Sequence, residues 1–217
     1  MIEWHVEEAW RQALHEAGID DYTQAMAYAA GEPASRKSHS QTWRLQTPQG
    51  LLFLKQDTST QAKNILRNLL RFRKPLSCTQ KERRNMERLR GMGFNFAEVV
   101  AYGGKSHLGL PDTAVMVTRP VPGRSIEDIW ADGTVPEARR LEARDLGLKT
   151  LKRLQDLDCD WQRDCKPEHF FLADDNRVFL IDVESMHFRR VPDKKRNMQT
   201  TRFLTLLDRA VQHAGNA

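Results

Sequence analysis

The pattern of hydrophobic and polar residues predicts an antiparallel sheet over residues 35–118. Within it, HSQTWRLQTPQGLLFLKQD alternates apolar and polar side chains on both sides of TPQG, which is typical of a β-hairpin. Because successive strand residues face opposite sides, Trp43 and Leu45 are expected on one face of its first strand. Two later stretches, AEVVAYG and TAVMVTRPVPG, predict two further strands, the second running into a Pro-Gly linker.

Apolar residues at helical spacing predict helices on both sides of these strands. Residues 1–34 are expected to form an amphipathic helical extension, with Trp10 and Leu14 at near-helical spacing and Gly31 and Pro33 as helix breakers. Further helices are predicted over KNILRNLLRFRKP (63–75), over TQKERRNMERLRGMG (79–93), along a stripe of leucines that starts near Pro136, and over roughly 200–212. Residues 119–217 are therefore expected to be mainly helical.

Composition and net charge narrow the class of protein. The three cysteines, Cys78, Cys159 and Cys165, have no CxxC spacing, which favours reduced thiols over a disulfide framework or a zinc site. The acidic start predicts no signal peptide, and no apolar run approaches the roughly 20 residues of a membrane span, so a cytoplasmic location is expected. Lys and Arg (34) outnumber Asp and Glu (29), a balance that suits phosphate-bearing partners or an anionic membrane surface.

The stretch QRDCKPEHFFL, residues 162–172, carries the side chains that phosphoryl transfer needs. That reaction requires a carboxylate to orient the acceptor hydroxyl, metal-holding groups and a lysine on the phosphates. Asp164 fits the base of an R-D-x-K-P-x-H loop, and His169 stands where protein kinases carry a metal-binding Asn. Asp182 follows the apolar strand VFLI, so we expect it to fold back beside the loop as a metal ligand.

The nucleotide phosphates are expected to contact residues of the predicted sheet. Lys55 ends the strand GLLFLK, and Glu82 begins a predicted helix, where it is expected to pair with Lys55, although Glu87 competes on the same helix. Such a contact near 4 Å is worth roughly 4 kcal/mol at an effective dielectric of about 20, before desolvation. The phosphate loop SRKSHSQTW has no glycine, so Ser38 and Ser40 are expected to contribute side-chain contacts.

Together these motifs resemble the protein-kinase-like superfamily, and EHFFL with IDVESMHFR is most similar to the bacterial lipopolysaccharide kinase family of Kdo and heptose kinases, with the WaaP- and InaA-type proteins. The resemblance covers about residues 35–210. It implies an α+β, bilobal kinase-like fold, with an antiparallel-sheet N-lobe and a short, mainly helical C-lobe. It also implies ATP with Mg²⁺, or alternatively Mn²⁺, and a lipopolysaccharide core sugar as acceptor, reached at the inner face of the inner membrane.

Several positions depart from the family pattern and keep alternatives open. Gln162 replaces the usual His, which removes a structural hydrogen-bonding group. Lys166 and Pro167 resemble serine/threonine protein kinases, and Lys166 is expected to neutralise the transferring phosphate. Since magnesium prefers oxygen ligands, His169 either binds through water, favours manganese or orients Asp164. Two alternatives to a sugar kinase therefore remain. One is a serine/threonine protein kinase. The other is a non-enzymatic pseudokinase scaffold, which Gln162 and the glycine-free loop suggest.

Two basic segments have competing interpretations. The helix predicted over 63–75 resembles a membrane-surface element, but it would also suit a solvated helix that packs through its leucines. A second cluster is either a binding site for a phosphorylated or acidic acceptor or a solvated charge run; it comprises Arg189, Arg190, Lys194, Lys195 and Arg196. Nucleic-acid binding is not expected, because stacking aromatic residues do not alternate with the basic ones.

Overall fold

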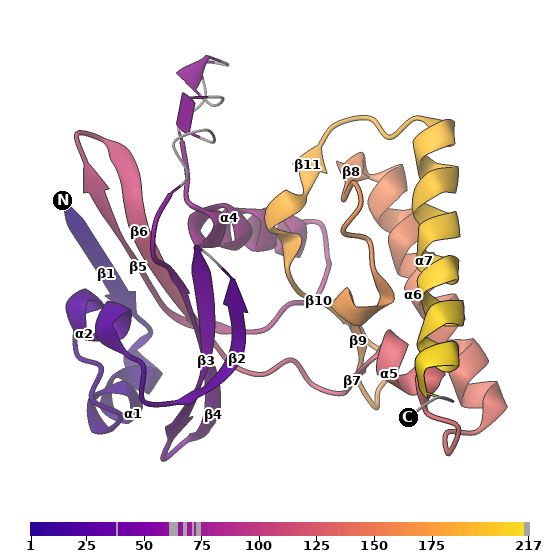
Figure 1. The fold of residues 1–217 in the computed structure, drawn as a ribbon, viewed down its shortest axis with the longest axis horizontal. Helices are drawn as coiled ribbons and strands as arrows, with labels where there is room; N and C mark the ends of the chain where they lie inside the picture. Colours follow the sequence, from indigo (N-terminus) through magenta and orange to yellow (C-terminus); the bar gives the residue numbers. More distant parts are fainter. Residues whose placement is uncertain (38, 61–64, 67–68, 71, 73–74, 215–217) are drawn as a thin grey trace. The chain divides into compact units, whose positions relative to one another are not determined.

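The chain forms two compact units in the computed structural model (Figure 1). The structure describes residues 1–37, 39–60, 65–66, 69–70, 72 and 75–214. The first unit comprises residues 1–84 and 98–120, and the second comprises residues 85–97 and 121–217. Residues 1–34, which were expected to form a helical extension, belong to the same unit as the sheet.

The first unit contains a six-stranded antiparallel sheet with the order β1-β5-β6-β4-β3-β2. Its strands are β1 (Ile2–Val6), β2 (Glu32–Lys37), β3 (Ser40–Thr47), β4 (Gly50–Asp57), β5 (Val99–His107) and β6 (Leu110–Thr118). The predicted hairpin is confirmed as β3 and β4, which pair from Ser40 with Asp57 to Thr47 with Gly50. Trp43 and Leu45 are both buried, as expected for residues on one face of a strand.

The expected helical extension over residues 1–34 begins instead with a strand. Ile2, Trp4 and Val6 alternate with polar residues, and this period of two matches β1, which pairs antiparallel with β5. Short helical elements follow before β2: η1 (Glu8–Trp10), α1 (Arg11–Glu16) and α2 (Tyr22–Ala27). Pairing with an existing sheet edge thus outweighs the weak helical spacing of the first residues.

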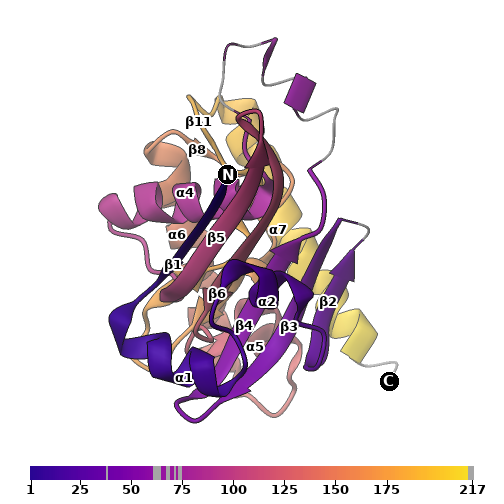
Figure 2. The ribbon, with the colours of Figure 1, turned by 90° about the vertical axis from the view of Figure 1, so that its left-hand side faces the viewer.

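Helices α1 and α2 cover one face of the sheet, as Figure 2 shows. Gln56 of β4 fixes α2 there, because its buried Nε2 donates hydrogen bonds to the carbonyl oxygens of Ala25 (2.8 Å) and Tyr28 (2.9 Å). Its Oε1 accepts a hydrogen bond from Trp43 Nε1 at 2.9 Å. Each polar atom of this buried amide is therefore satisfied, and the N-terminal segment is part of the core.

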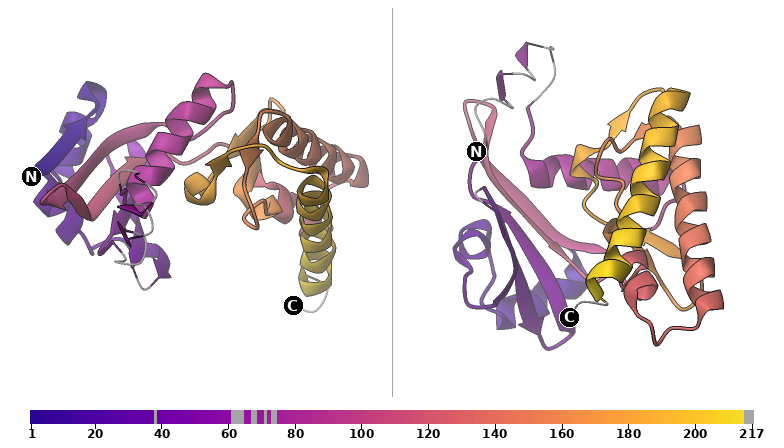
Figure 3. Two further views of the ribbon diagram at one scale, coloured as in Figure 1. Left: turned by 90° about the horizontal axis from the view of Figure 1, so that it is seen from above. Right: turned by 45° about the vertical axis from the view of Figure 1, so that its right-hand side comes forward.

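The second unit is mainly helical, as predicted. Its helices are α5 (Ile126–Ala131), α6 (Glu137–Asp156) and α7 (Asp193–Ala214), and its short strands are β7 (Arg124–Ser125), β8 (Cys159–Asp160), β9 (Phe170–Leu172), β10 (Val178–Leu180) and β11 (His187–Phe188). Figures 1 and 3 show α6 and α7 side by side. Phe170 lies at the centre of the core, with its ring centroid 5.2 Å from those of Trp161 and Phe203. These rings support the loop between β8 and β9.

Two remaining helical predictions have different outcomes. The helix predicted over 79–93 is α4 (Cys78–Gly91), whose first half belongs to the first unit and whose second half belongs to the second. The helix predicted over 63–75 lies largely outside the described residues. Among the helices that the structure describes, none has the length and apolar character needed to cross a membrane.

Gly147, in the middle of α6, is expected to tolerate no larger side chain. A Cβ atom at this position would lie 2.7 Å from Ile126 Cδ1 and 2.8 Å from Phe203 Cζ. We expect Gly147→Val to lower the free energy of unfolding by about 1–3 kcal/mol through overpacking. Urea unfolding measures this loss, and Gly133→Val is the control because nothing lies within 4 Å of its Cβ position. Equal unfolding midpoints for the two variants would contradict this packing.

Candidate active site

The first turn of α4 is held by a capping box and by strand β4. The backbone amide of Gln80 donates to Ser77 Oγ (3.2 Å), and the amide of Ser77 donates to Gln80 Oε1 (3.1 Å). The buried Asp57 carboxylate of β4 accepts a hydrogen bond from the Thr79 amide at 2.6 Å. The helix start is thus fixed to the sheet by polar contacts.

Lys55 and Glu82 form the expected ion pair one turn further along α4. Lys55 Nζ lies 2.5 Å from Glu82 Oε2, and the two side chains are only 19% and 8% exposed, respectively. Solvent screens such a partly buried pair less than a surface pair, so the lysine is held in one position. The competing candidate, Glu87, is exposed.

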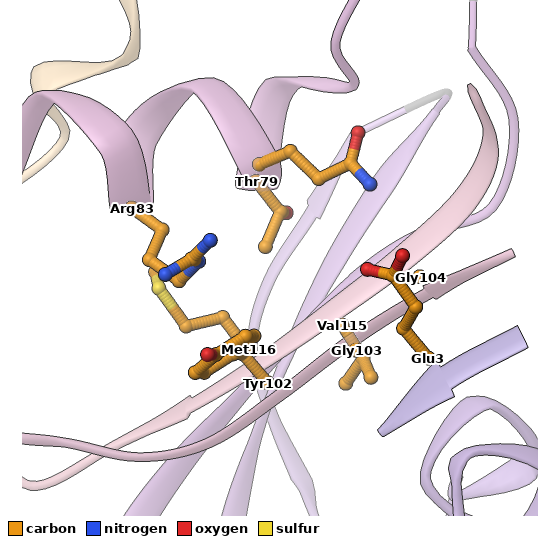
Figure 4. Close-up of a pocket in the computed structure, with 9 residues that line it drawn as sticks. Glu3, Thr79, Arg83, Tyr102, Gly103, Gly104, Val115 and Met116 are labelled. Carbon is orange, nitrogen blue, oxygen red and sulfur yellow. The ribbon is translucent and has the colours of Figure 1, made fainter. Parts of the chain in front are cut away.

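A small pocket lies between α4 and the sheet within the first unit (Figure 4). Thr79 and Arg83 of α4 line one side, and Tyr102 and Met116 of β5 and β6 line the other. The Arg83 guanidinium carbon lies 3.9 Å from the centroid of the Tyr102 ring, a cation–π contact. Met116 pairs in register with Lys55, so the pocket and the Lys55 side chain share one face of the sheet.

One of the two serines that were expected to contact phosphate, Ser40, lies in the sheet. Ser40 begins β3 opposite Asp57 of β4, which places it on the same sheet face as Lys55 because side chains alternate along a strand. Ser38 lies outside the described residues. The structure therefore supports the placement of Ser40 near the lysine side of the sheet.

The loop after β8 presents Asp164 from a tightly turned backbone. The Asp164 amide donates to the Trp161 carbonyl oxygen (3.1 Å), and the Lys166 amide donates to the Asp164 carbonyl oxygen (2.8 Å). Gln162 adopts a left-handed conformation with φ of 55°, which is uncommon for a residue with a side chain. Within the described residues, the structure records no ion pair or side-chain hydrogen bond to the Asp164 carboxylate, which leaves it available to a substrate.

Gln162 makes a structural hydrogen bond, although the departure from the usual His predicted the loss of such a group. Its Nε2 donates to the carbonyl oxygen of Ser185 at 3.1 Å. Ser185 ends the short element η3 (Val183–Ser185), which follows Asp182 directly. The expectation that Gln162 lacks a structural hydrogen bond is therefore wrong, because its side-chain amide joins the Asp164 loop to the segment after Asp182.

His169 is buried and joins the Asp164 loop to the acidic side chains. Its Nδ1 lies 2.8 Å from the Asp164 carbonyl oxygen, and its Nε2 lies 3.4 Å from Glu168 Oε1 and 3.8 Å from Asp182 Oδ2. Because a carbonyl oxygen can only accept, Nδ1 carries a proton. The other ring nitrogen, Nε2, then faces the carboxylates of Glu168 and Asp182.

Asp182 presents its carboxylate from a left-handed turn after β10. Its φ is 55° and its ψ is 46°, and its side chain is 29% exposed. The carboxylate oxygens of Asp182 and Glu184 lie within 4.8 Å of each other. These hard oxygen ligands suit Mg²⁺ or Mn²⁺, so the donor set fits the expected metal. Glu184 was missed in the sequence; its signal is the D-x-E spacing in IDVES.

Lys166 lies beside the carboxylates of this unit. Its Nζ forms an ion pair with Glu168 Oε1 at 2.8 Å. The hydrogen bond to Glu168, with the negative charges of Asp164 and Asp182, raises the pKa of the Lys166 ammonium above its ordinary value. The side chain is therefore a permanent cation at neutral pH.

The basic cluster after Asp182 is largely engaged within the protein. Arg189 and Lys195 both contact the buried carboxylate of Asp160, and Arg196 pairs with Asp156. The two remaining members are exposed; they are Arg190 and Lys194. A uniform solvated charge run is thus wrong for this segment, and only part of it is available to an acceptor.

The thiols of Cys159 and Cys165 are expected to be unreactive in the folded protein. Neither forms a disulfide, and burial raises the pKa of Cys159 to about 11 and that of Cys165 to about 12. The reactive thiolate is then scarce near neutral pH and increases as the pH rises. A maleimide reagent should label the exposed Cys78 rapidly and the other two only after denaturation, as peptide mass spectrometry can show. Rapid native labelling of all three would contradict the buried positions.

The two units together define the class of protein. Two features characterise the protein-kinase-like superfamily. The first is an antiparallel sheet whose lysine pairs with a glutamate of the following helix. The second is a helical unit that carries one aspartate in a loop and another after a strand. In a structural comparison the chain matches a solved structure described as WaaP in complex with acyl carrier protein, with a TM-score of 0.59 and 19% identity. The match covers 95% of this chain and 89% of that one, and it confirms the kinase-like fold.

Sequence comparison then gives the family. The model of the lipopolysaccharide kinase (Kdo/WaaP) family matches residues 20–212, and the chain belongs to this family. It is also 31% identical over 157 residues to the lipopolysaccharide core heptose(I) kinase WaaP of Escherichia coli. That alignment covers 67% of this chain and 59% of the relative, so the chain spans less than two thirds of the relative's length.

Proposed function

We propose that this chain transfers the γ-phosphate of ATP to a hydroxyl group of a lipopolysaccharide core sugar. The observation that carries the proposal is the family match over residues 20–212, supported by the similarity to a heptose kinase. The available carboxylate of Asp164, on a loop fixed by His169, supplies the geometry for such a reaction. The active protein is proposed to work in the cytoplasm, at the inner face of the inner membrane.

Asp164 acts as the base in the proposed reaction. Its carboxylate accepts the proton of the acceptor hydroxyl while the acceptor oxygen forms a bond to the γ-phosphorus. The bond from that phosphorus to the bridging oxygen breaks, and ADP leaves with the electron pair. Lys166, held beside the loop by Glu168, offsets the negative charge on the transferring group.

Asp182 and His169 would hold the divalent cation, with Glu184 as an additional ligand. A bound Mg²⁺ or Mn²⁺ neutralises negative charge on the phosphates of ATP. His169 reaches this position because its Nδ1 is committed to the Asp164 carbonyl oxygen, which directs Nε2 toward Asp182. One histidine thus both orients the base loop and donates to the metal.

Lys55 binds the α- and β-phosphates, and Glu82 keeps its ammonium in place. Ser40 adds a hydroxyl contact on the same sheet face, and Ser38 is proposed to act with it. These side-chain contacts replace some of the backbone N–H contacts to phosphate that a glycine-rich loop provides in other kinases. We expect the affinity for nucleotide to be modest as a result.

Segment 63–75 is proposed to contact an anionic membrane. Of its described residues, Leu66, Leu70 and Phe72 are 59%, 73% and 101% exposed, which is unusual for large apolar side chains in water. Basic residues alternate with them in the sequence and suit acidic lipid.

The membrane proposal predicts binding to vesicles that contain an anionic phospholipid, weakening as salt increases. A variant with Leu70→Ser and Phe72→Ser should bind about tenfold more weakly, because two apolar side chains are lost from the interface. Leu108→Ser, an 89% exposed position in another turn, is the matched control. Unchanged vesicle sedimentation of the double variant would exclude this surface.

The acceptor class is tested by competition. Labelled ATP is incubated with the protein, a lipopolysaccharide core preparation and a protein extract. Label on the core oligosaccharide supports the proposal, whereas label on protein alone favours the serine/threonine kinase alternative suggested by Lys166 and Pro167. Absence of label on either, with activity in cells retained by Asp164→Ala, favours the pseudokinase alternative.

A further inference from the structure

Asp160, at the end of β8, is a fully buried carboxylate with a dense set of donors. Its side chain is 0% exposed, and its Oδ1 accepts hydrogen bonds from the Gln162 amide (3.0 Å) and from Gln199 Nε2 (3.1 Å). Its Oδ2 accepts from Arg189 Nε (2.9 Å) and Lys195 Nζ (2.6 Å). Burial alone would raise the pKa of the Asp160 carboxyl, but the bonds from Lys195 and Arg189 hold it below its ordinary value.

These donors come from the two segments that carry the proposed chemistry and from α7. Gln162 belongs to the loop that presents Asp164. Arg189 ends the segment that follows Asp182, and its backbone amide also donates to the Asp158 carbonyl oxygen at 2.7 Å. Lys195 and Gln199 belong to α7, so one carboxylate joins both loops to a long helix.

A second set of contacts connects the residues around Asp160 to the chain neighbour of Asp164. Gln199 Nε2 also donates to the Gln162 carbonyl oxygen (3.3 Å), and the Cys165 thiol lies 3.5 Å from that oxygen and 3.7 Å from the Gln199 carbonyl oxygen. Cys165 is the immediate neighbour of Asp164 and is fully buried. Loss of the Asp160 contacts should therefore expose the Cys165 thiol. The Cys159 thiol faces the other side of β8, 3.9 Å from Met92 Sδ, and serves as the reference.

We propose that Asp160 is a positioning residue that fixes the Asp164 loop relative to the segment after Asp182. The inference rests on the proposed function, because a fixed Asp164 loop matters for catalysis only if Asp164 is the base. A base must lie within hydrogen-bonding distance of the hydroxyl it deprotonates, and a displacement of about 1 Å can lower the rate on the order of 100-fold. Part of the basic cluster is thus used to hold the loops rather than to bind the acceptor.

The test combines catalysis with a thiol reporter that needs no substrate. In a Cys78→Ser background, labelling rates of Cys159 and Cys165 are measured in the same molecule by peptide mass spectrometry. Asp160→Asn should raise the Cys165 rate about tenfold while leaving the Cys159 rate within about twofold, because opening is local. Asp156→Asn, which removes the carboxylate that pairs with Arg196, is the matched control and should change neither rate.

Arg189→Gln is a second variant that leaves Lys195 to neutralise Asp160, so it avoids an unpaired buried charge. We expect a smaller rise in the Cys165 rate, about threefold, and for both variants a lower kcat with a KM for ATP within about twofold. Equal rises at Cys159 and Cys165 would indicate global unfolding and overturn the positioning role. Unchanged Cys165 rates in both variants would also overturn it. A wild-type protein that phosphorylates no sugar would refute the proposed function, while the thiol rates would still decide whether Asp160 fixes the loop.

Discussion

Asp164→Asn should abolish phosphate transfer while leaving the protein folded. The amide cannot accept the hydroxyl proton, and loss of a general base typically lowers kcat by about 10²–10⁴-fold. The structure records no ion pair or side-chain hydrogen bond to the Asp164 carboxylate within the described residues, so its loss should cost little stability. Steady-state transfer from labelled ATP measures the change, together with the thermal unfolding midpoint.

Asp174→Asn is the control for this variant. Asp174 is an exposed aspartate in the turn between β9 and β10, and its replacement should leave kcat unchanged. If Asp164→Asn kept wild-type kcat, another group would have to act as the base. If both variants lost activity with lower unfolding midpoints, the loss would reflect damage to the fold.

Asp182→Asn should remove the stabilisation of the protein by ATP and a divalent metal. Ligand at about 100 times its dissociation constant stabilises a folded protein by about 2.7 kcal/mol, which appears as a higher unfolding midpoint. The amide loses the charge that holds the cation, so the metal-dependent part of this shift should disappear. Thermal unfolding with ATP and Mg²⁺ or Mn²⁺, compared with ATP and a chelator, separates the two contributions.

Asp175→Asn is the matched control for the metal experiment, since Asp175 forms an ion pair with Arg177 in an exposed turn. It should retain the full metal-dependent shift. A shift in Asp182→Asn equal to that of the wild type would contradict the assignment of Asp182 as a metal ligand. A shift with Mn²⁺ much larger than with Mg²⁺ would support His169 as a direct ligand.

The positions of the main site residues could be predicted from the sequence, because these residues lie in or next to strands and helices with clear local patterns. Lys55 lies in β4, a strand with a clear period of two that runs on to Asp57, and Glu82 lies near the start of a helix with a capping signal, so their pairing follows from the order of the elements. The Asp164 loop and Asp182 lie on either side of the β9–β10 hairpin, which brings them together. Local sequence patterns were therefore sufficient to identify Lys55, Glu82, Asp164 and Asp182 as candidate site residues.

Contacts that depend on tertiary packing could not be predicted. Nothing local indicates that Asp160 is buried, or that Arg189 and Lys195 both pair with it. The hydrogen bond from Gln162 to Ser185 also joins segments far apart in the sequence. The N-terminal strand is a different case. The alternation of Ile2, Trp4 and Val6 indicates a strand, but the helical spacing of the residues that follow favoured a helix over the whole segment.

Phosphorus NMR of a dephosphorylated lipopolysaccharide core oligosaccharide, after incubation with the protein, ATP and Mg²⁺, tests the proposed sugar kinase activity directly. We expect a new phosphate monoester whose phosphorus couples to a proton of a core sugar, with no such signal for Asp164→Asn. A wild-type reaction that binds ATP and metal yet yields no sugar phosphate monoester would contradict it.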